Sequence, residues 1–144
     1  MYEKTINDFL FSTHKSKLQL EVIYNYLSKE SYWAQNIPLD IVKQSIDGSV
    51  CFGIYLKNKQ IGYARVITDC ATFGYLADVF VLEEHRGKGL SKELMKFIMA
   101  HPSFKKLRRF MLATKDAQGL YKQFGFNQLA MPERIMEIKF FDTY

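Results

Sequence analysis

The residues best suited to chemistry lie in a glycine-containing turn between an apolar run and a helical pattern. The turn consists of Arg86, Gly87, Lys88, Gly89, Leu90 and Ser91. A turn that opens a helix presents several backbone N–H groups at the positive end of the helix dipole, and this suits an anion. Glycine permits a positive φ and lets a ligand approach the backbone closely. The pattern therefore predicts a phosphate or pyrophosphate site.

Basic residues are concentrated in the same part of the chain. The 144 residues carry 20 basic and 15 acidic side chains, a formal net charge of +5. Residues 86–109 hold eight of the basic side chains and one acidic side chain, Glu93, so this segment carries +7 and the remainder −2. Such a local field favours a polyanionic ligand. On spacing alone, a plain strand–helix connection with basic side chains in solvent stays open.

Several classes of polyanion site are excluded by the motifs. The chain has no G-x-x-x-x-G-K-[ST] loop, so the turn is not a Walker A loop. It is not a dinucleotide-binding fingerprint, because the third glycine is missing. A nucleic-acid-binding module using the basic patch at 86–109 stays an alternative, although no helix-turn-helix, RRM or KH pattern is present.

Two motifs give the chain a family resemblance. Residues 86–91 are similar to the R/Q-x-x-G-x-G/A motif of the GNAT superfamily of acetyl-CoA-dependent N-acetyltransferases, with Ser91 at the final small position. Residues 117–126 resemble the A-x-x-L-Y-x-x-x-G-F segment of the same family, and Thr114 stands where relatives often have Asn. The order and strand–helix context of both motifs match, so the resemblance covers nearly the whole chain. It is weakest over residues 1–49, where the acceptor usually binds.

The resemblance implies an acetyl-CoA site and a proton donor. The backbone of the strand that contains Val79 and Val81 would pair with the pantetheine arm, and the pyrophosphate would lie at residues 86–91. The N–H of Val79 would stabilise the oxyanion. Tyr121 would protonate the leaving thiolate, since a phenol with a pKa near ~10 is protonated when a thiol with a pKa near ~8.5 leaves. On spacing alone, Tyr121 could equally be a packing residue.

The general base is not defined by the sequence. Some relatives carry Glu near the position of Tyr75, and no carboxylate stands there. Asp78 lies inside the apolar strand, where a charged side chain needs a partner. It is either a base acting through water or a carboxylate held by nearby donors. Asp69, in the preceding loop, is a weaker candidate of the same kind.

Four aromatic residues are candidates for the acceptor site: Tyr32, Trp33, Phe73 and Tyr75. An aromatic-lined pocket suits a small amine or cation. Ordinary core packing is the alternative, because aromatic residues make up 15% of the chain. The expected acceptor is a primary amine of a small molecule or a peptide.

Placing these residues requires a mixed, mostly antiparallel α/β sheet flanked by helices, in one domain over residues 1–144. The periodicity predicts strands at 5–13, 50–56, 61–68, 73–82 and 107–113, and a strand region from 126 that resumes over 135–141. It predicts helices at 18–27, 39–46 and 116–124, and a helix that begins at residue 90 and ends near residues 101–102. The strand at 73–82 is apolar enough for burial on both faces. The family resemblance implies a sheet that splays near this strand.

Other expectations are mostly negative. The three histidines share no ligand spacing, so no metal is expected. No export or membrane-spanning segment is recognised, and a cytoplasmic location is expected. Homodimerisation is left open. Besides the enzyme and the nucleic-acid module, an inactive acyl-CoA-binding sensor stays an alternative.

Overall fold

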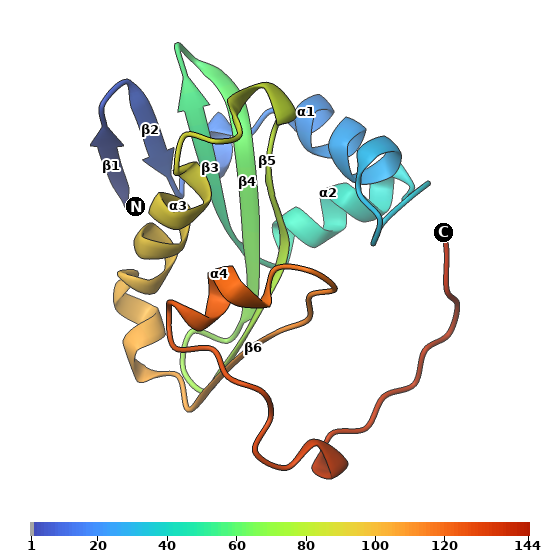
Figure 1. The fold of residues 1–144 in the computed structure, drawn as a ribbon. Helices are drawn as coiled ribbons and strands as arrows, with labels where there is room; N and C mark the ends of the chain where they lie inside the picture. Colours follow the sequence, from blue (N-terminus) through green and yellow to red (C-terminus); the bar gives the residue numbers. More distant parts are fainter. Residues whose placement is uncertain (1) are drawn as a thin grey trace.

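The computed structural model describes residues 2–144 and contains one six-stranded sheet. In sheet order, which is also chain order, its strands are β1 (Glu3–Ile6), β2 (Phe9–Ser12), β3 (Val50–Leu56), β4 (Lys59–Thr68), β5 (Phe73–Val81) and β6 (Arg109–Leu112). The first five strands are antiparallel neighbours, and β5 and β6 are parallel (Figure 1). The predicted mixed, mostly antiparallel sheet is confirmed.

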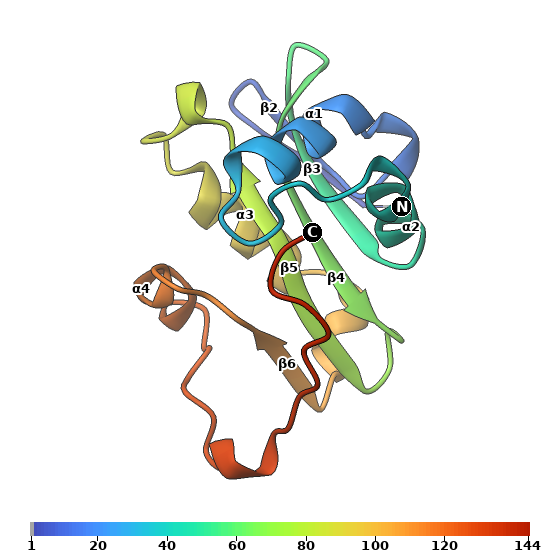
Figure 2. The same cartoon turned by 90° about the vertical axis from the view of Figure 1, so that its right-hand side faces the viewer.

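Helices cover both faces of the sheet. They are α1 (Leu20–Asn25), continued by a π-helical turn η2 (Tyr26–Glu30), then α2 (Leu39–Asp47), α3 (Leu90–Met99) and α4 (Gln118–Lys122). Short 3-10 turns are η1 (Lys15–Lys17), η3 (Glu83–His85), η4 (Pro102–Lys106) and η5 (Pro132–Arg134). Figure 2 shows α1 and α2 on one side of the strands and α3 on the other. None of the helices in the described residues is long and apolar enough to cross a membrane.

Alternation along the strands divides the apolar core into two layers. Phe52 and Ile54 of β3 face α3 and pack in one cluster with its Leu94. Cys51 lies on the opposite face of the same strand and packs with Ile23 of α1 in the second cluster. Successive side chains of a strand point to opposite faces, so a β-rich sequence covered on both sides builds both layers at once.

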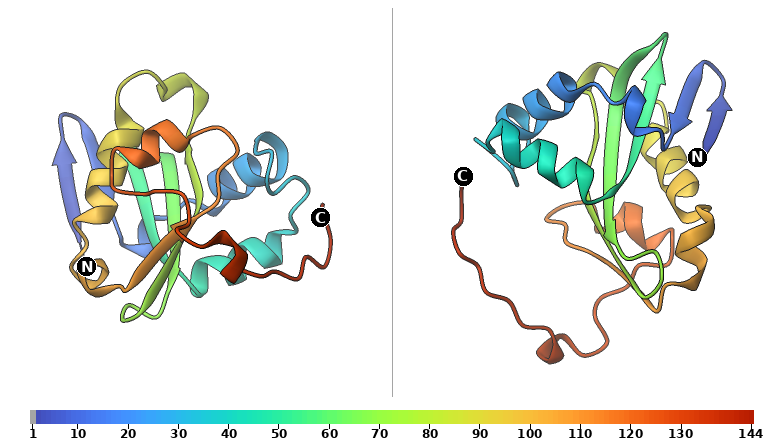
Figure 3. Two further views of the ribbon diagram at one scale, coloured as in Figure 1. Left: turned by 60° about the horizontal axis from the view of Figure 1, so that its bottom comes forward. Right: turned by 180° about the vertical axis from the view of Figure 1, so that it is seen from behind.

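The two ends of the chain differ from the sequence-based expectation. Residues 5–13 were predicted as one strand, but Asn7 has a φ of 53° and a turn separates β1 from β2. Strands were also predicted from Phe126 and over residues 135–141, and the described residues contain no strand after β6. Residues 127–144 instead leave the body as an arm that pairs with no strand of the described residues (Figure 3).

The sheet opens between its two parallel strands. β5 pairs with β6 only from Phe73 to Leu76, so the rest of β5 has a free edge on that side. Asp78 has a φ of 55°, and the pairing of β5 with β4 shifts register here. A bulge of this kind bends the strand and increases its twist. The bulged half of β5 consequently diverges from β6 (Figure 2), as the expected splay requires. The same opening leaves β5 only partly buried, contrary to the prediction of burial on both faces.

Candidate active site

A cleft of about 380 Å³ lies where β5 and β6 diverge. Its floor is formed by residues 75–79 of β5. One wall is formed by residues 112–114, at the end of β6 and directly after it, and by Tyr121 of α4. Tyr32 and Trp33, from the segment between η2 and α2, form the opposite wall. Residues that lie far apart in the sequence therefore meet at the splayed strands.

Tyr121 is presented to this cleft by a short, well-terminated helix. Thr114 Oγ1 accepts a hydrogen bond of 3.1 Å from the N–H of Ala117 at the start of α4, and Gly125 follows the helix with a φ of 96°. The Tyr121 side chain is buried and packs edge-on against Phe126. Burial raises the pKa of its phenol to about 12. The hydroxyl is consequently protonated at neutral pH and able to donate a proton.

Asp78 is held by two donors from different parts of the fold. Arg65 Nε of β4 donates to Oδ2 at 2.6 Å, and Trp33 Nε1 donates to Oδ1 at 2.8 Å. The Asp78 side chain is only 9% exposed. Since both carboxylate oxygens are engaged, the geometry favours the held carboxylate over the water-assisted base. Asp78 thereby ties the aromatic wall of the cleft to the bulge of β5.

Three of the four predicted aromatic residues line the cleft. Tyr32 and Trp33 pack edge-to-face with ring centroids 5.0 Å apart, and Tyr75 lies on the floor. The Tyr32 hydroxyl accepts a hydrogen bond from the N–H of Lys115. Phe73 lies outside the cleft lining, at the far start of β5 opposite Arg109.

Several residues of the cleft were missed by the sequence analysis, and three of them have ionisable side chains. Asp116 is exposed on the cleft wall, and within residues 2–144 no basic side chain forms an ion pair with it. Its position directly before the motif at 117–126 could have singled it out. Arg65 and Tyr144 also line the cleft. Neither carries a signal in the sequence, because each is brought there by folding from a distant strand or from the arm.

The glycine turn opens a second cleft, of about 310 Å³, beyond the end of β5. Gly87 and Gly89 have φ values of 81° and 75°, and a Cβ on either would meet no protein atom within 4 Å. The glycines are therefore required for the backbone conformation and leave open space in front of it. The first hydrogen bond of α3 is the one that the N–H of Glu93 donates to the carbonyl of Gly89. The N–H groups of residues 90–92 precede it and have no partner within the helix.

The arginine of the turn has a structural role in the molecule. Arg86 Nε donates to the carbonyl of Val81 at 3.0 Å, and Nη2 donates to the hydroxyl of Tyr26 at 2.9 Å. These bonds fix the turn against the end of β5 and against η2. Arg86 also forms part of the lining of this cleft, so its positive charge lies beside it.

Other polar groups at the turn differ from the expectation. Lys88 does not line this cleft; its Nζ lies 5.9 Å from the centroid of the Phe9 ring. Lys92 does line it, together with Leu90 and Ser91. His85 Nδ1 is buried at the same place without a hydrogen-bond partner among the described residues. An unsatisfied buried nitrogen at the mouth of an anion cradle fits a ligand that carries phosphate oxygens.

The basic segment is divided between the two ends of α3. Arg86, Lys88 and Lys92 lie at the turn, but the basic residues at 105–109 follow the other end of the helix. A ten-residue helix is about 15 Å long. The sequence analysis placed the whole +7 charge beside the turn, and the structure keeps only part of it there.

Comparison with known proteins identifies the chain. Residues 47–128 match the family model described as acetyltransferase (GNAT) domain, which spans both motifs and most of the site. This chain is a member of the GNAT acetyltransferase family. A protein of Gibberella zeae, whose name assigns it provisionally to the acetyltransferases, is 34% identical over 137 residues, with 81% of this chain and 77% of the relative covered.

Solved structures of GNAT proteins share the fold. A crystal structure from Xanthomonas campestris pv. campestris, provisionally assigned as a GNAT-family acetyltransferase, is 48% identical and has a TM-score of 0.91, covering 94% of this chain and 95% of that one. A GNAT acetyltransferase from Elizabethkingia anophelis, solved with acetyl-CoA bound, has a TM-score of 0.64 at 13% identity, covering 92% and 88%. The GNAT resemblance in the sequence is thus confirmed. The family model begins at residue 47, so Tyr32 and Trp33 lie outside it.

Proposed function

We propose that this GNAT protein transfers an acetyl group from acetyl-CoA to a primary amine of a small molecule or a peptide. One observation carries the proposal: the splayed half of β5 joins an anion-binding turn at residues 86–91 to a cleft that contains a buried, protonated Tyr121. An elongated acyl-CoA needs both ends of such a path, with phosphates at the turn and a thioester in the cleft.

The residues along the path fit the cofactor. The free edge of β5 includes Val79 and Val81, and the backbone groups of an unpaired edge can hydrogen-bond an extended ligand. Gly87, Gly89 and the N-terminus of α3 offer N–H groups to a pyrophosphate, and the unpartnered Nδ1 of His85 lies beside them.

Acetyl-CoA supplies an activated thioester. The amine nitrogen forms a bond to the acetyl carbonyl carbon while the bond between that carbon and the CoA sulfur breaks. The amine loses one proton, and the leaving thiolate gains one. In the proposed mechanism the Tyr121 hydroxyl donates that last proton, since its raised pKa keeps it protonated until a thiolate appears. The N–H of Val79 stabilises negative charge on the acetyl oxygen. The amine proton leaves through water at the open mouth of the cleft.

The acceptor side is best suited to a cationic amine. Trp33 and Tyr75 offer aromatic faces, and Asp116 adds an exposed carboxylate at the wall. Aromatic faces and a carboxylate both attract an ammonium group before it is deprotonated. Asp78, which holds Trp33 by its indole N–H, keeps that wall in place.

The experiment combines binding and turnover. The purified protein is melted with and without acetyl-CoA, and release of free CoA thiol is then measured against a panel of primary amines. We expect stabilisation by acetyl-CoA and amine-dependent thiol release. Stabilisation without turnover on any amine would favour the acyl-CoA-binding sensor. No response to acetyl-CoA, with salt-dependent binding to nucleic acid, would favour the nucleic-acid module and refute the proposal.

A further inference from the structure

Tyr26 lies between the glycine turn and the active-site cleft and contacts a residue of each. Its hydroxyl accepts the hydrogen bond of 2.9 Å from Nη2 of Arg86, which lines the cleft at the turn. Its ring stacks on Phe80 of β5, with centroids 4.0 Å apart and an interplanar angle of 9°. The same ring packs at a tilt against Trp33, with centroids 6.3 Å apart, and Trp33 lines the active-site cleft. One buried side chain therefore joins the two clefts.

The two clefts are otherwise separate. Within residues 2–144 they have no lining residue in common, and Tyr26 lines neither. A ligand confined to the cleft at the turn can contact Arg86 but not Trp33. Any effect of such a ligand on Trp33 must therefore pass through packed and hydrogen-bonded side chains, which can carry coupling between sites.

The backbone at Tyr26 has an uncommon conformation. Tyr26 starts the π-helical turn η2, and its carbonyl accepts a hydrogen bond of 2.9 Å from the N–H of Ser31, five residues later. Such wide turns are rare and occur frequently at functional sites. Tyr32 and Trp33 follow within a stretch of bends and turns, outside any helix or strand. The position of Trp33 therefore depends on its side-chain contacts, with Tyr26 and Tyr32 and through the bond to Asp78.

Arg86 can hold a phosphate and Tyr26 at the same time. A guanidinium group carries five N–H donors in a rigid planar fork. Among the described residues, Arg86 donates one N–H to the carbonyl of Val81 and one to the hydroxyl of Tyr26, so three remain for a ligand. A phosphate that accepts from these donors would fix the guanidinium between the ligand and Tyr26. A second ligand pays less for ordering side chains that a first ligand has already ordered.

We propose that Tyr26 is a positioning residue that couples the glycine turn to the aromatic wall of the active-site cleft. A phosphate at the turn fixes Arg86, Arg86 fixes the Tyr26 hydroxyl, and the Tyr26 ring holds Trp33 in place for the amine. The inference rests on the proposed function, since it takes the pyrophosphate of acetyl-CoA as the ligand of the turn. It follows that bound acetyl-CoA raises the affinity for the amine, and that the amine raises the affinity for acetyl-CoA by the same factor.

Fluorescence of Trp33 tests the coupling without any measurement of turnover, because Trp33 is the only tryptophan in the sequence. The residue is 42% exposed, so acrylamide can quench it. The probe is 3′-phospho-ADP, the part of CoA that carries the pyrophosphate but no pantetheine arm. At a concentration that calorimetry shows to be saturating, we expect the probe to lower the quenching constant of the wild type.

Two variants break the proposed link. Tyr26→Phe keeps the ring but removes the hydroxyl that Arg86 binds. Its affinity for the probe should fall by roughly two- to tenfold, the contribution of one hydrogen bond, and the saturating probe should leave its quenching constant unchanged. Arg86→Lys loses the planar fork and should also lose the change in quenching. The control Tyr24→Phe removes a hydroxyl from α1 at a residue that lines neither cleft, and it should behave as the wild type.

The outcomes separate this inference from the proposed function. A probe that binds the wild type without lowering the quenching constant would overturn the coupling and leave the proposed function intact. The same holds if the probe lowers the constant equally in Tyr26→Phe. A probe that does not bind the wild type in calorimetry would remove the phosphate site from the turn, and it would overturn both the coupling and the cofactor site of the proposed function.

Discussion

Replacing Asp78 with asparagine separates a structural carboxylate from a catalytic base. The variant Asp78→Asn keeps the shape of the side chain and one oxygen acceptor, but it removes the negative charge opposite Arg65. Hydrogen bonds to charged groups contribute about 1.5–3 kcal/mol, and breaking a fully buried ion pair costs about 3–5 kcal/mol. The Arg65 side chain is 17% exposed and keeps a bond to Ser49. We therefore expect a loss of about 2 kcal/mol in the free energy of unfolding.

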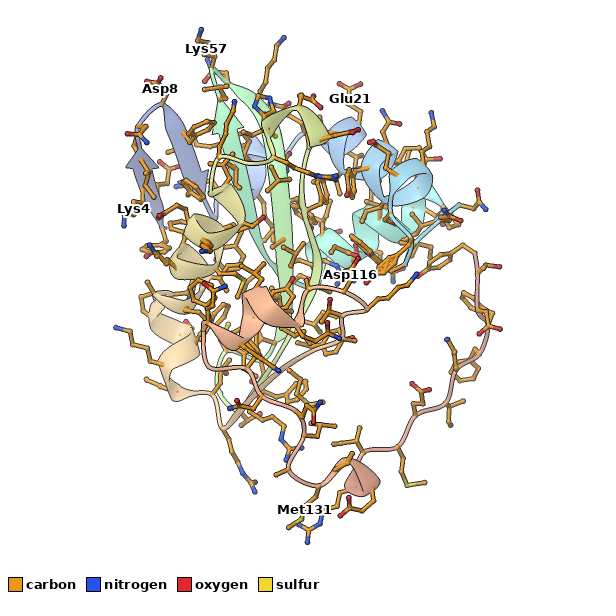
Figure 4. All side chains as sticks on the ribbon, in the orientation of Figure 1. Lys4, Asp8, Glu21, Lys57, Asp116 and Met131 are labelled. Carbon is orange, nitrogen blue, oxygen red and sulfur yellow. The ribbon has the colours of Figure 1, made fainter. Side chains whose placement is uncertain are left out.

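A chain of this length loses roughly 4 °C in Tm for each kcal/mol, so Tm should fall by about 8 °C. Denaturant unfolding measures the same loss independently. Asp8→Asn, at the exposed turn between β1 and β2 (labelled in Figure 4), is the control and should change stability by less than about 0.5 kcal/mol.

The kinetic readout completes this test. The single amide oxygen of asparagine can accept from only one of the two donors, Arg65 and Trp33, so the wall formed by Trp33 is held less firmly and KM for the amine should rise. The pH dependence of kcat should keep its shape, because no titrating base is lost. Rescue of KM by Asp78→Glu would agree with a positioning role. An unchanged Tm together with the loss of one limb of the pH–rate profile would refute the reasoning and make Asp78 the base.

Three other substitutions probe the proposed roles. Tyr121→Phe should lower kcat by ~10²-fold or more without changing the affinity for acetyl-CoA. The control Tyr24→Phe, away from the active-site cleft and the cleft at the glycine turn, should change neither kcat nor this affinity. Equal turnover in the two variants would mean that Tyr121 is only a packing residue. Burial raises the pKa of Tyr121 from 10 to about 12, so its contribution to the free energy of unfolding is complete below pH 10 and is lost as pH rises towards 12. In Tyr121→Phe the free energy of unfolding should therefore fall less between pH 10 and pH 12 than in the wild type. Gly89→Glu should abolish acetyl-CoA binding in calorimetry, through backbone strain and like charge, and the control Gly48→Glu should bind normally; retained affinity in the first would remove the turn from the cofactor site. Tyr144→Ala should raise KM for the amine and leave KM for acetyl-CoA unchanged, and the reverse pattern would contradict its place in the acceptor cleft.

Local sequence was sufficient to predict the backbone features of the candidate site that depend on local geometry. Gly87 and Gly89 were identified because few residues other than glycine adopt a φ near +80° at the start of a helix. Tyr121 was identified through its motif, and Gly125 ends its helix as expected. The hairpin of β3 and β4 was also predictable, since its turn at Lys57 and Asn58 separates two β-rich runs.

Features that depend on distant partners were not predictable. The fixed state of Asp78 needs Arg65 on the next strand and Trp33 from another segment, and these meet only because the register of β5 shifts at the bulge. Tyr144 reaches the cleft by the path of the arm. Residues 135–141 have a strand-like sequence, but a strand also needs a neighbour to pair with, and in the structure these residues pair with none.

Transfer of a labelled acetyl group is the most direct test of the proposed function. The wild-type protein is incubated with acetyl-CoA labelled with ¹³C in the acetyl group and with a panel of primary amines, and the products are analysed by mass spectrometry. We predict an amine that carries the labelled acetyl group in amounts equal to the CoA thiol released. Bound acetyl-CoA with no labelled amine from any member of the panel, or thiol release with label only in acetate, would contradict N-acetyl transfer.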